Sequence, residues 1–247
     1  WLIGDLYQGS WSPSISLNDF SILKKINKVF ITHLHKDHWD SETIKHFNPD
    51  VEFYIPNLTF NKIITDEIKN MGFSNIYMKD LKEWFDVNED LSCFCIPPLN
   101  SGAQDEEFYK DHSNISPTAI DTGFIFSDKS SKTNHLILCD NSPYDIEFAL
   151  NNISNIKIDS LWFPFNGYAG DFPLCYDNFS LKEKKEFSAL MSRKRESLLI
   201  ELVNEINPSV LIPHSSDFLL NGIRQKEFFD VHEEEFIFRD GYAKRIQ

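Results

Sequence analysis

The sequence of this 247-residue chain predicts an α/β fold, in which short buried strands alternate with helices. Short apolar runs such as residues 91–96 are typical of strands, whereas residues 180–206 carry apolar side chains at helical spacing. A chain that alternates between these patterns places helices against the faces of its sheets. A third observation concerns polar residues: three histidines and an aspartate stand within six positions, directly after one apolar run.

Length and composition favour one domain that spans residues 1–247. The hydrophobic content is 41% and the charged content 25%, as in ordinary globular proteins. The sequence contains no internal repeat, low-complexity tract or linker that would divide it. A chain of this length can build one substantial core, so a single α/β domain is the simplest expectation.

Charge and targeting signals restrict the partners. The net charge of −14 and the isoelectric point near 4.9 disfavour a broad nucleic-acid surface, because phosphate binding needs a basic face. No apolar run approaches about 20 residues, and no signal-peptide pattern opens the chain. The cysteines form neither a C-x-x-C pair nor a disulfide framework. We therefore expect a cytoplasmic protein that binds neither nucleic acid nor membrane.

Strands and helices alternate through the first half of the chain. Ser41 is the expected N-cap of one helix, and Gly72 ends another. Residues 97–116 form a polar, acidic loop too long for a simple connection, and such loops are typical of function or mobility. The expected helices are 16–26, 41–47 and 61–71, and the expected strands are 29–31, 51–55, 76–78, 83–87 and 91–96.

The second half continues the pattern. Residues 119–126 and 135–139 predict the arms of a hairpin whose turn is 127–134. A strand at 158–163 precedes an aromatic loop, and the helix at 180–206 leads to a strand that ends at His214. Residues 225–247 indicate a final helix and strand.

Residues 32–40, T-H-L-H-K-D-H-W-D, concentrate histidine in a chain that has only 8. In an extended backbone His33 and His35 point to the same side, and Asp37 and His38 follow where the chain turns. Imidazole nitrogen and carboxylate oxygen bind zinc, iron or manganese, so the stretch predicts two adjacent metal positions. The alternative is a solvated, charged loop at the end of a strand.

The motif H-x-H-x-D-H resembles the signature of the metallo-β-lactamase superfamily. That resemblance implies a four-layer αββα sandwich with one or two bound metals. In several members a D-P-W-L-type motif follows the first strands, and W-L-I-G-D-L at residues 1–6 resembles the segment after it. We therefore expect a sandwich that lacks its first N-terminal strands or receives them from another piece.

The resemblance also implies further ligands downstream. Asp140 directly follows an apolar run, although it could simply open a turn, and His214 stands in the same way after V-L-I-P. His112 is the candidate in the long acidic loop, whereas His135 should lie at the opposite end of the sheet. The implied sets are His33, His35 and His112 for one metal and Asp37, His38 and His214 for the other, with Asp140 bridging.

The implied cofactors are two divalent metal ions, zinc or iron, with manganese possible. Two metals about 3.5–4 Å apart acidify a shared water, and the resulting hydroxide serves as the nucleophile in hydrolysis. By the resemblance, Asp140 would hold both metals, and Asp37 could orient or deprotonate the water. Asp37 and Asp140 are thus the catalytic candidates.

A second block narrows the resemblance. The loop G-Y-A-G-D-F-P-L-C-Y, the basic cluster R-K-R on the following helix and W-L-I-G-D-L resemble the metallo-β-lactamase-fold domain of CMP-N-acetylneuraminate hydroxylases. Those enzymes hydroxylate the N-acyl group of a nucleotide-linked sialic acid, using a Rieske domain ahead of this fold. The alternatives are a structural loop and solvated helix charges. The implied substrate-binding residues are Asn166, Tyr168, Asp171, Tyr176, Arg193 and Lys194.

Two departures shape the functional hypothesis. The sequence contains no Rieske cysteine and histidine pattern, and His214 stands where the hydroxylase pattern carries an aromatic residue. The leading hypothesis is a metal-dependent hydrolase that acts on a small anionic substrate, phosphorylated or sugar-like. The alternatives are an iron-dependent oxygenase or hydroxylase of a nucleotide sugar, served by a separate Rieske-type redox partner, and a non-catalytic binding protein that retains the fold.

Overall fold

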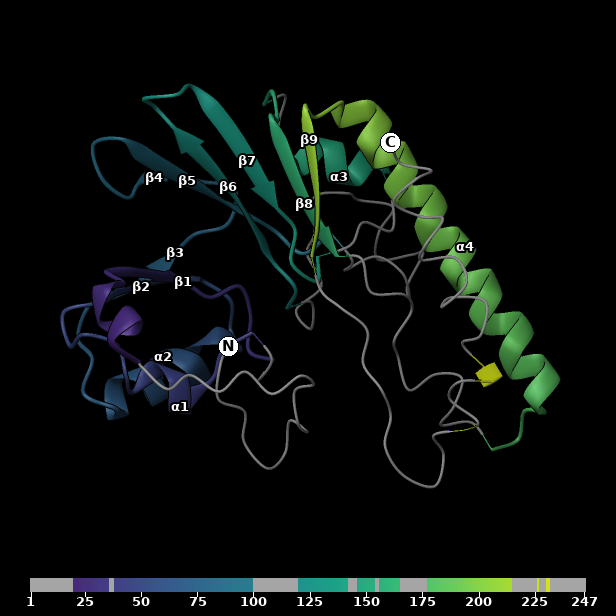
Figure 1. The fold of residues 1–247 in the computed structure, drawn as a ribbon, viewed down its shortest axis with the longest axis horizontal. Helices are drawn as coiled ribbons and strands as arrows, with labels where there is room; N and C mark the ends of the chain where they lie inside the picture. Colours follow the sequence, from purple (N-terminus) through teal and green to yellow (C-terminus); the bar gives the residue numbers. More distant parts are fainter. Residues whose placement is uncertain are drawn as a thin grey trace. The chain divides into compact units, whose positions relative to one another are not determined.

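The computed structural model describes residues 20–35, 38–99, 120–141, 146–153, 156–164 and 177–214, together with residues 226, 230 and 231. The chain divides into two compact units, Trp1–Lys132 and Thr133–Gln247, and each is described by itself (Figure 1). Whether the chain forms a single domain stays a prediction.

A parallel three-stranded sheet lies at the centre of the first unit. Its order is β1 (Lys28–Phe30), β2 (Glu52–Pro56) and β3 (Ile76–Lys79). Val29 pairs with Phe53, and Phe53 pairs with Ile76. Parallel strands are usually covered on both faces, and the almost continuously buried β2 agrees with this rule.

Helices cover one face of this sheet (Figure 1). They are the 3-10 helix η1 (Phe20–Lys25), α1 (Ser41–Ile44) and α2 (Asn61–Asn70). Burial of each large apolar side chain between these layers stabilises the unit by about 1.5–3 kcal/mol. The buried cluster contains Leu23, Ile31, Trp39, Ile44, Phe47, Val51, Phe53, Ile55, Ile64, Ile68 and Phe73.

The other face of the sheet packs on an antiparallel sheet through aromatic side chains. This second sheet contains β4 (Trp84–Asp86), β5 (Leu91–Ile96) and β6 (Gly123–Asp128). Tyr54 stacks on Phe30 with ring centroids 4.9 Å apart, and it joins the buried residues of β5 and β6 in one cluster. The described part of the first unit is therefore a helical layer on two face-to-face sheets.

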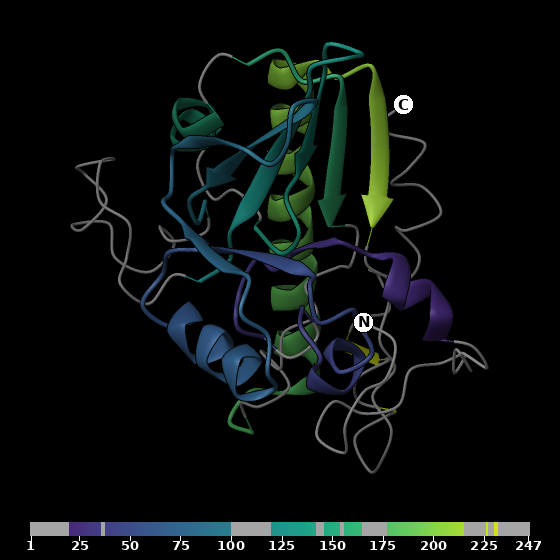
Figure 2. The ribbon, with the colours of Figure 1, turned by 90° about the vertical axis from the view of Figure 1, so that its left-hand side faces the viewer.

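The described residues of the second unit include three parallel strands and the helices α3 and α4. The strands β7 (Thr133–Ile137), β8 (Ser160–Pro164) and β9 (Val210–His214) pair in that order, and Figure 2 shows β8 and β9 as parallel arrows. The helix α3 (Ile146–Ile153) contacts α4 (Leu181–Ile206). The buried apolar residues of this unit include Leu136, Leu138, Ala149, Leu161, Phe163, Leu199 and Leu202.

The predicted α/β class is confirmed, and several predicted elements recur with shifts of one or two residues. The strand predicted at 91–96 matches β5, and the helix predicted at 180–206 begins one residue later with Ser180 as its N-cap. The expected hairpin arms correspond to β6 and β7, which residues 129–132 connect. Among the described residues, no helix is long and apolar enough to cross a membrane.

Three expectations were wrong or incomplete. The described part of the helix predicted at 16–26 is 3-10, because so short a segment gains little from α-helix nucleation. The N-cap of α1 is Asp40 and not Ser41, since the Asp40 carboxylate accepts hydrogen bonds from the backbone of Glu42 and Thr43. The helix α3 was not predicted. The expectations for residues 1–19 and for most of 225–247 lie outside the described residues.

Candidate metal centre

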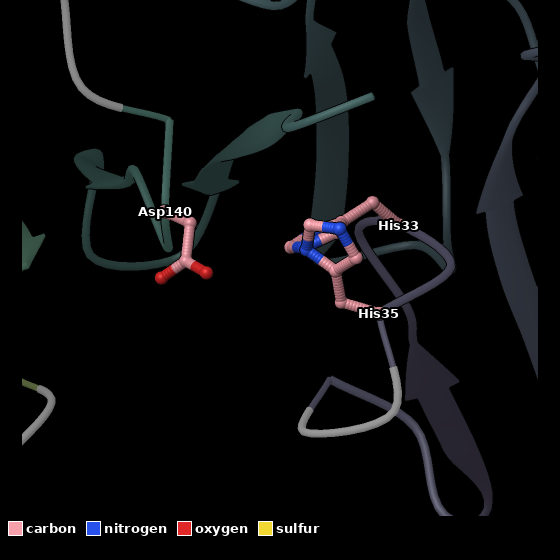
Figure 3. Close-up of side chains that lie close together, drawn as sticks. All are labelled: His33, His35 and Asp140. Atoms are coloured by element: carbon pink, nitrogen blue, oxygen red, sulfur yellow. The ribbon is translucent and has the colours of Figure 1, made fainter. Parts of the chain in front are cut away.

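The backbone that leaves β1 places His33 and His35 against each other. His33 is fully buried and His35 is exposed. Nε2 of His33 lies 3.0 Å from Nδ1 of His35, and the two rings meet edge to face with centroids 4.7 Å apart (Figure 3). The expectation that both side chains point to one side of the extended backbone agrees with this geometry.

The spacing of the two nitrogens fits a shared metal ion. With metal–nitrogen distances of about 2.0–2.1 Å, neighbouring donor atoms in a tetrahedral site lie about 3.3 Å apart. The observed 3.0 Å is within a few tenths of an ångström of that edge. In the metal-free chain the same spacing allows an N–H···N hydrogen bond between the two neutral rings.

The second ring nitrogen of His33 has a partner of its own. Nδ1 lies 3.0 Å from the hydroxyl Oγ1 of Thr32, in a buried contact. A proton on Nδ1 would be donated to this hydroxyl, which leaves the Nε2 lone pair facing His35. Metal-ligating histidines are generally oriented in this way by a partner on the other nitrogen.

The carbonyl of Thr32 is held from two sides. The hydroxyl of Thr122, at the entrance to β6, donates to this carbonyl at 2.7 Å. The side-chain amide of Asn61, the first residue of α2, approaches the same oxygen at 3.4 Å. Thr122 and Asn61 are both fully buried, so the strand end that carries His33 is fixed by polar contacts from two distant segments.

A turn brings His38 back beside His33. The backbone N–H of His38 donates to the carbonyl of His35 at 2.9 Å, and the indole of Trp39 donates to the carbonyl of Leu34 at 2.8 Å. The His38 and His33 rings then lie 4.1 Å apart between centroids. The structure therefore brings three of the predicted ligands together, although their role as ligands stays a prediction.

Asp140 and His214 lie at one edge of the second unit's sheet. Asp140 follows β7 by three residues, in a turn that Cys139 enters with a φ of 52° (Figure 3). His214 ends β9 in register with Pro164, which ends β8. Because the strands are parallel, both residues stand at their carboxyl ends, where the sequence predicted them. His135 is instead paired with Ser160 at the start of β8, at 2.7 Å between Nδ1 and Oγ.

The remaining predicted site residues divide into two groups. Arg193 and Lys194 lie on α4 with exposed side chains, which leaves both the substrate-binding and the solvated interpretation open. The others lie outside the described residues, and they are Asp37, His112, Asn166, Tyr168, Asp171 and Tyr176.

Sequence reasoning missed Asp121. Its Oδ1 lies 3.4 Å from Nε2 of His33, and its side chain is 20% exposed. Asp121 precedes β6, whereas the predicted ligands Asp140 and His214 stand at the ends of strands. The available signal was a carboxylate directly before the apolar run G-F-I-F, which is weak without the pairing of β5 and β6.

Comparison with known proteins finds relatives over most of the chain. No family model matches the sequence. The cytidine monophosphate-N-acetylneuraminic acid hydroxylase of Asterias rubens is 25% identical over 231 residues, which cover 89% of this chain and 31% of that protein. The hydroxylase of the same name from Mus musculus is 23% identical over 231 residues, which cover 89% of this chain and 35% of that protein. The chain thus spans about a third of the length of these curated relatives.

Solved structures show more distant likenesses. The isothiocyanate hydrolase from Delia radicum gut bacteria has a TM-score of 0.46 and 17% identity, covering 81% of this chain and 78% of that one. A possible metal-dependent hydrolase from Veillonella parvula has a TM-score of 0.47 and 14% identity, and the match covers 80% of this chain and 77% of that one.

The two curated relatives are metallo-β-lactamase-fold proteins, and the described residues of the chain form the α/β fold class that its sequence predicts. Within that class, the chain is similar to CMP-N-acetylneuraminate hydroxylases, which confirms the resemblance stated from the motifs.

Proposed function

We propose that the chain is a metal-dependent enzyme in which His33 Nε2 and His35 Nδ1 hold a metal ion. The observation that carries the proposal is their 3.0 Å separation, with a buried Thr32 partner on the far side of the His33 ring. A bound divalent cation would polarise the substrate and increase the acidity of water at this position. The exposure of His35 leaves the site open to a substrate.

We also propose that Asp140 and His214 supply further ligands, with Asp140 bridging two metal positions. Their support is the donor chemistry and the placement of both residues at the carboxyl ends of parallel strands. His38 belongs to the same proposal because its ring lies against His33. The roles of Asp37 and His112 rest on the motif resemblance alone.

The proposed reaction is hydrolysis of a small anionic substrate, phosphorylated or sugar-like. A chain with a net charge of −14 repels anions on average, so such a substrate needs a local positive charge. Bound cations would supply that charge, and the exposed Arg193 and Lys194 are the candidates for a second contact.

Hydroxylation of a nucleotide-linked sugar is the second candidate. The two hydroxylases, similar to 89% of the chain, favour it. It would require iron and a redox partner that supplies electrons.

Metal content separates these functions. Protein purified without chelator and without oxygen is subjected to elemental analysis, beside the variants His33→Ala and His35→Ala and the control His46→Ala. About two zinc or manganese ions per chain would support hydrolysis and direct assays to phosphoesters and lactones, whereas iron would favour hydroxylation. The two site variants should lose metal and the control should retain it. A chain that binds no metal, even after reconstitution, would overturn the proposal.

A further inference from the structure

We infer that Asp121 is a third ligand at the metal position of His33 and His35, an inference that rests on the proposed function. The geometry points to this role because the Asp121 carboxylate approaches the same nitrogen that faces His35. From Nε2 of His33, Nδ1 of His35 lies at 3.0 Å and Oδ1 of Asp121 at 3.4 Å.

Both separations are those expected between neighbouring ligands of one metal ion. Donor atoms about 2.1 Å from a metal lie about 3.0 Å apart in an octahedral site and about 3.4 Å apart in a tetrahedral one. To close such a site, the exposed His35 ring and the Asp121 carboxylate would move toward one another. The fully buried His33 would be its fixed point.

The two residues that follow Asp121 are held by hydrogen bonds to the histidine motif and to β5. Thr122 donates its hydroxyl hydrogen bond to the carbonyl of Thr32, the residue before His33. Gly123, the next residue, pairs with Ile96 across β5 and β6. The backbone that carries the carboxylate is therefore held by these contacts, although Asp121 lies 88 positions after His33 in the sequence.

The carboxylate also changes the charge and the metal preference of the site. Two neutral imidazoles leave a divalent cation with its full charge, whereas an added carboxylate neutralises half of it. Two imidazoles with one carboxylate are also the donor set that holds iron(II) with open positions for other ligands. Asp121 thus makes the position suitable for iron(II) as well as for zinc.

The test is anaerobic titration with cobalt(II) and iron(II), followed by the cobalt absorption spectrum and by chelator competition. The variant Asp121→Asn keeps the size and a hydrogen-bond acceptor but removes the anionic ligand. Asp66→Asn, at an exposed aspartate of α2 with 74% of its side chain accessible, is the matched control. We expect Asp121→Asn to weaken metal affinity at least tenfold and to change the cobalt spectrum, with the control unchanged.

If Asp121 only orients the His33 ring and does not bind the metal, a different result is expected. Asparagine can still accept a hydrogen bond, so affinity and spectrum would then match those of the unaltered protein, and the inference would be overturned. If His33→Ala abolishes binding in the same series, the proposed function stands without this ligand. If the unaltered protein binds none of the metals, both proposals fail. Thermal unfolding of the metal-free proteins checks that each variant is folded.

Discussion

Replacing Thr122 with valine removes one hydroxyl and tests whether the start of β6 holds the metal motif in place. The lost contact is the 2.7 Å hydrogen bond to the carbonyl of Thr32. That carbonyl keeps only the longer approach of the Asn61 amide at 3.4 Å, so the loss of a buried hydrogen bond should destabilise the fold by about 1–2 kcal/mol. For a chain of this size, about 2–4 °C per kcal/mol gives a decrease in Tm of about 2–8 °C.

The same change should weaken metal binding without removing any proposed ligand. Thr122 holds Thr32, whose hydroxyl contacts the far nitrogen of His33, and loss of an outer partner lowers metal affinity on the order of tenfold. The assays are thermal unfolding of the metal-free protein and titration with zinc or cobalt(II) under chelator competition.

Thr65→Val provides the matched control. Its hydroxyl donates to the carbonyl of Lys62 at 2.8 Å, within α2, and Thr65 is buried like Thr122, at 5% against 0% exposed. This variant should lose a comparable hydrogen bond and keep its metal affinity. The reasoning would be refuted if Thr122→Val retained full affinity, or if both variants lost it equally.

Three further predictions concern the other unit, the substrate and the response to acid. Asp140→Ala should remove most bound metal and nearly all activity, and two retained metals per chain would exclude its bridging role. Arg193→Ala should raise KM with metal content unchanged, and an unchanged KM would assign Arg193 to the solvated surface. Hydrogen bonds from Lys28 and Tyr54 hold the pKa of Glu52 below its ordinary value of 4.5. Ionised Glu52 therefore contributes stability that is lost as the pH falls below about 4.5, so Glu52→Gln should flatten the acid side of the unfolding curve; an unchanged slope contradicts this.

Local patterns carried enough information to predict much of the fold. The helix α4 follows from Ser180 and Glu183, which form a capping box, together with a long helical period. The strand β5 follows from a short apolar run whose last four residues are buried. The placement of the His33 and His35 side chains on the same side follows from the alternation of side chains along an extended backbone. Each of these predictions depends on residues near one another in the sequence.

Features that depend on tertiary contacts could not be predicted in this way. Asp121 lies beside His33 only because β6 pairs with β5 and Thr122 bonds to Thr32. No spacing rule connects positions so far apart. The N-cap of α1 was predicted wrongly for a different reason, since Asp40 and Ser41 are both favourable cap residues and backbone geometry decides between them.

Thr32 connects these observations because three polar contacts meet at this one residue. Its hydroxyl contacts His33, and its carbonyl is approached by the buried side chains of Thr122 and Asn61. Buried contacts of this kind restrain the end of the strand, and a metal site needs its ligands held to within about 0.5 Å.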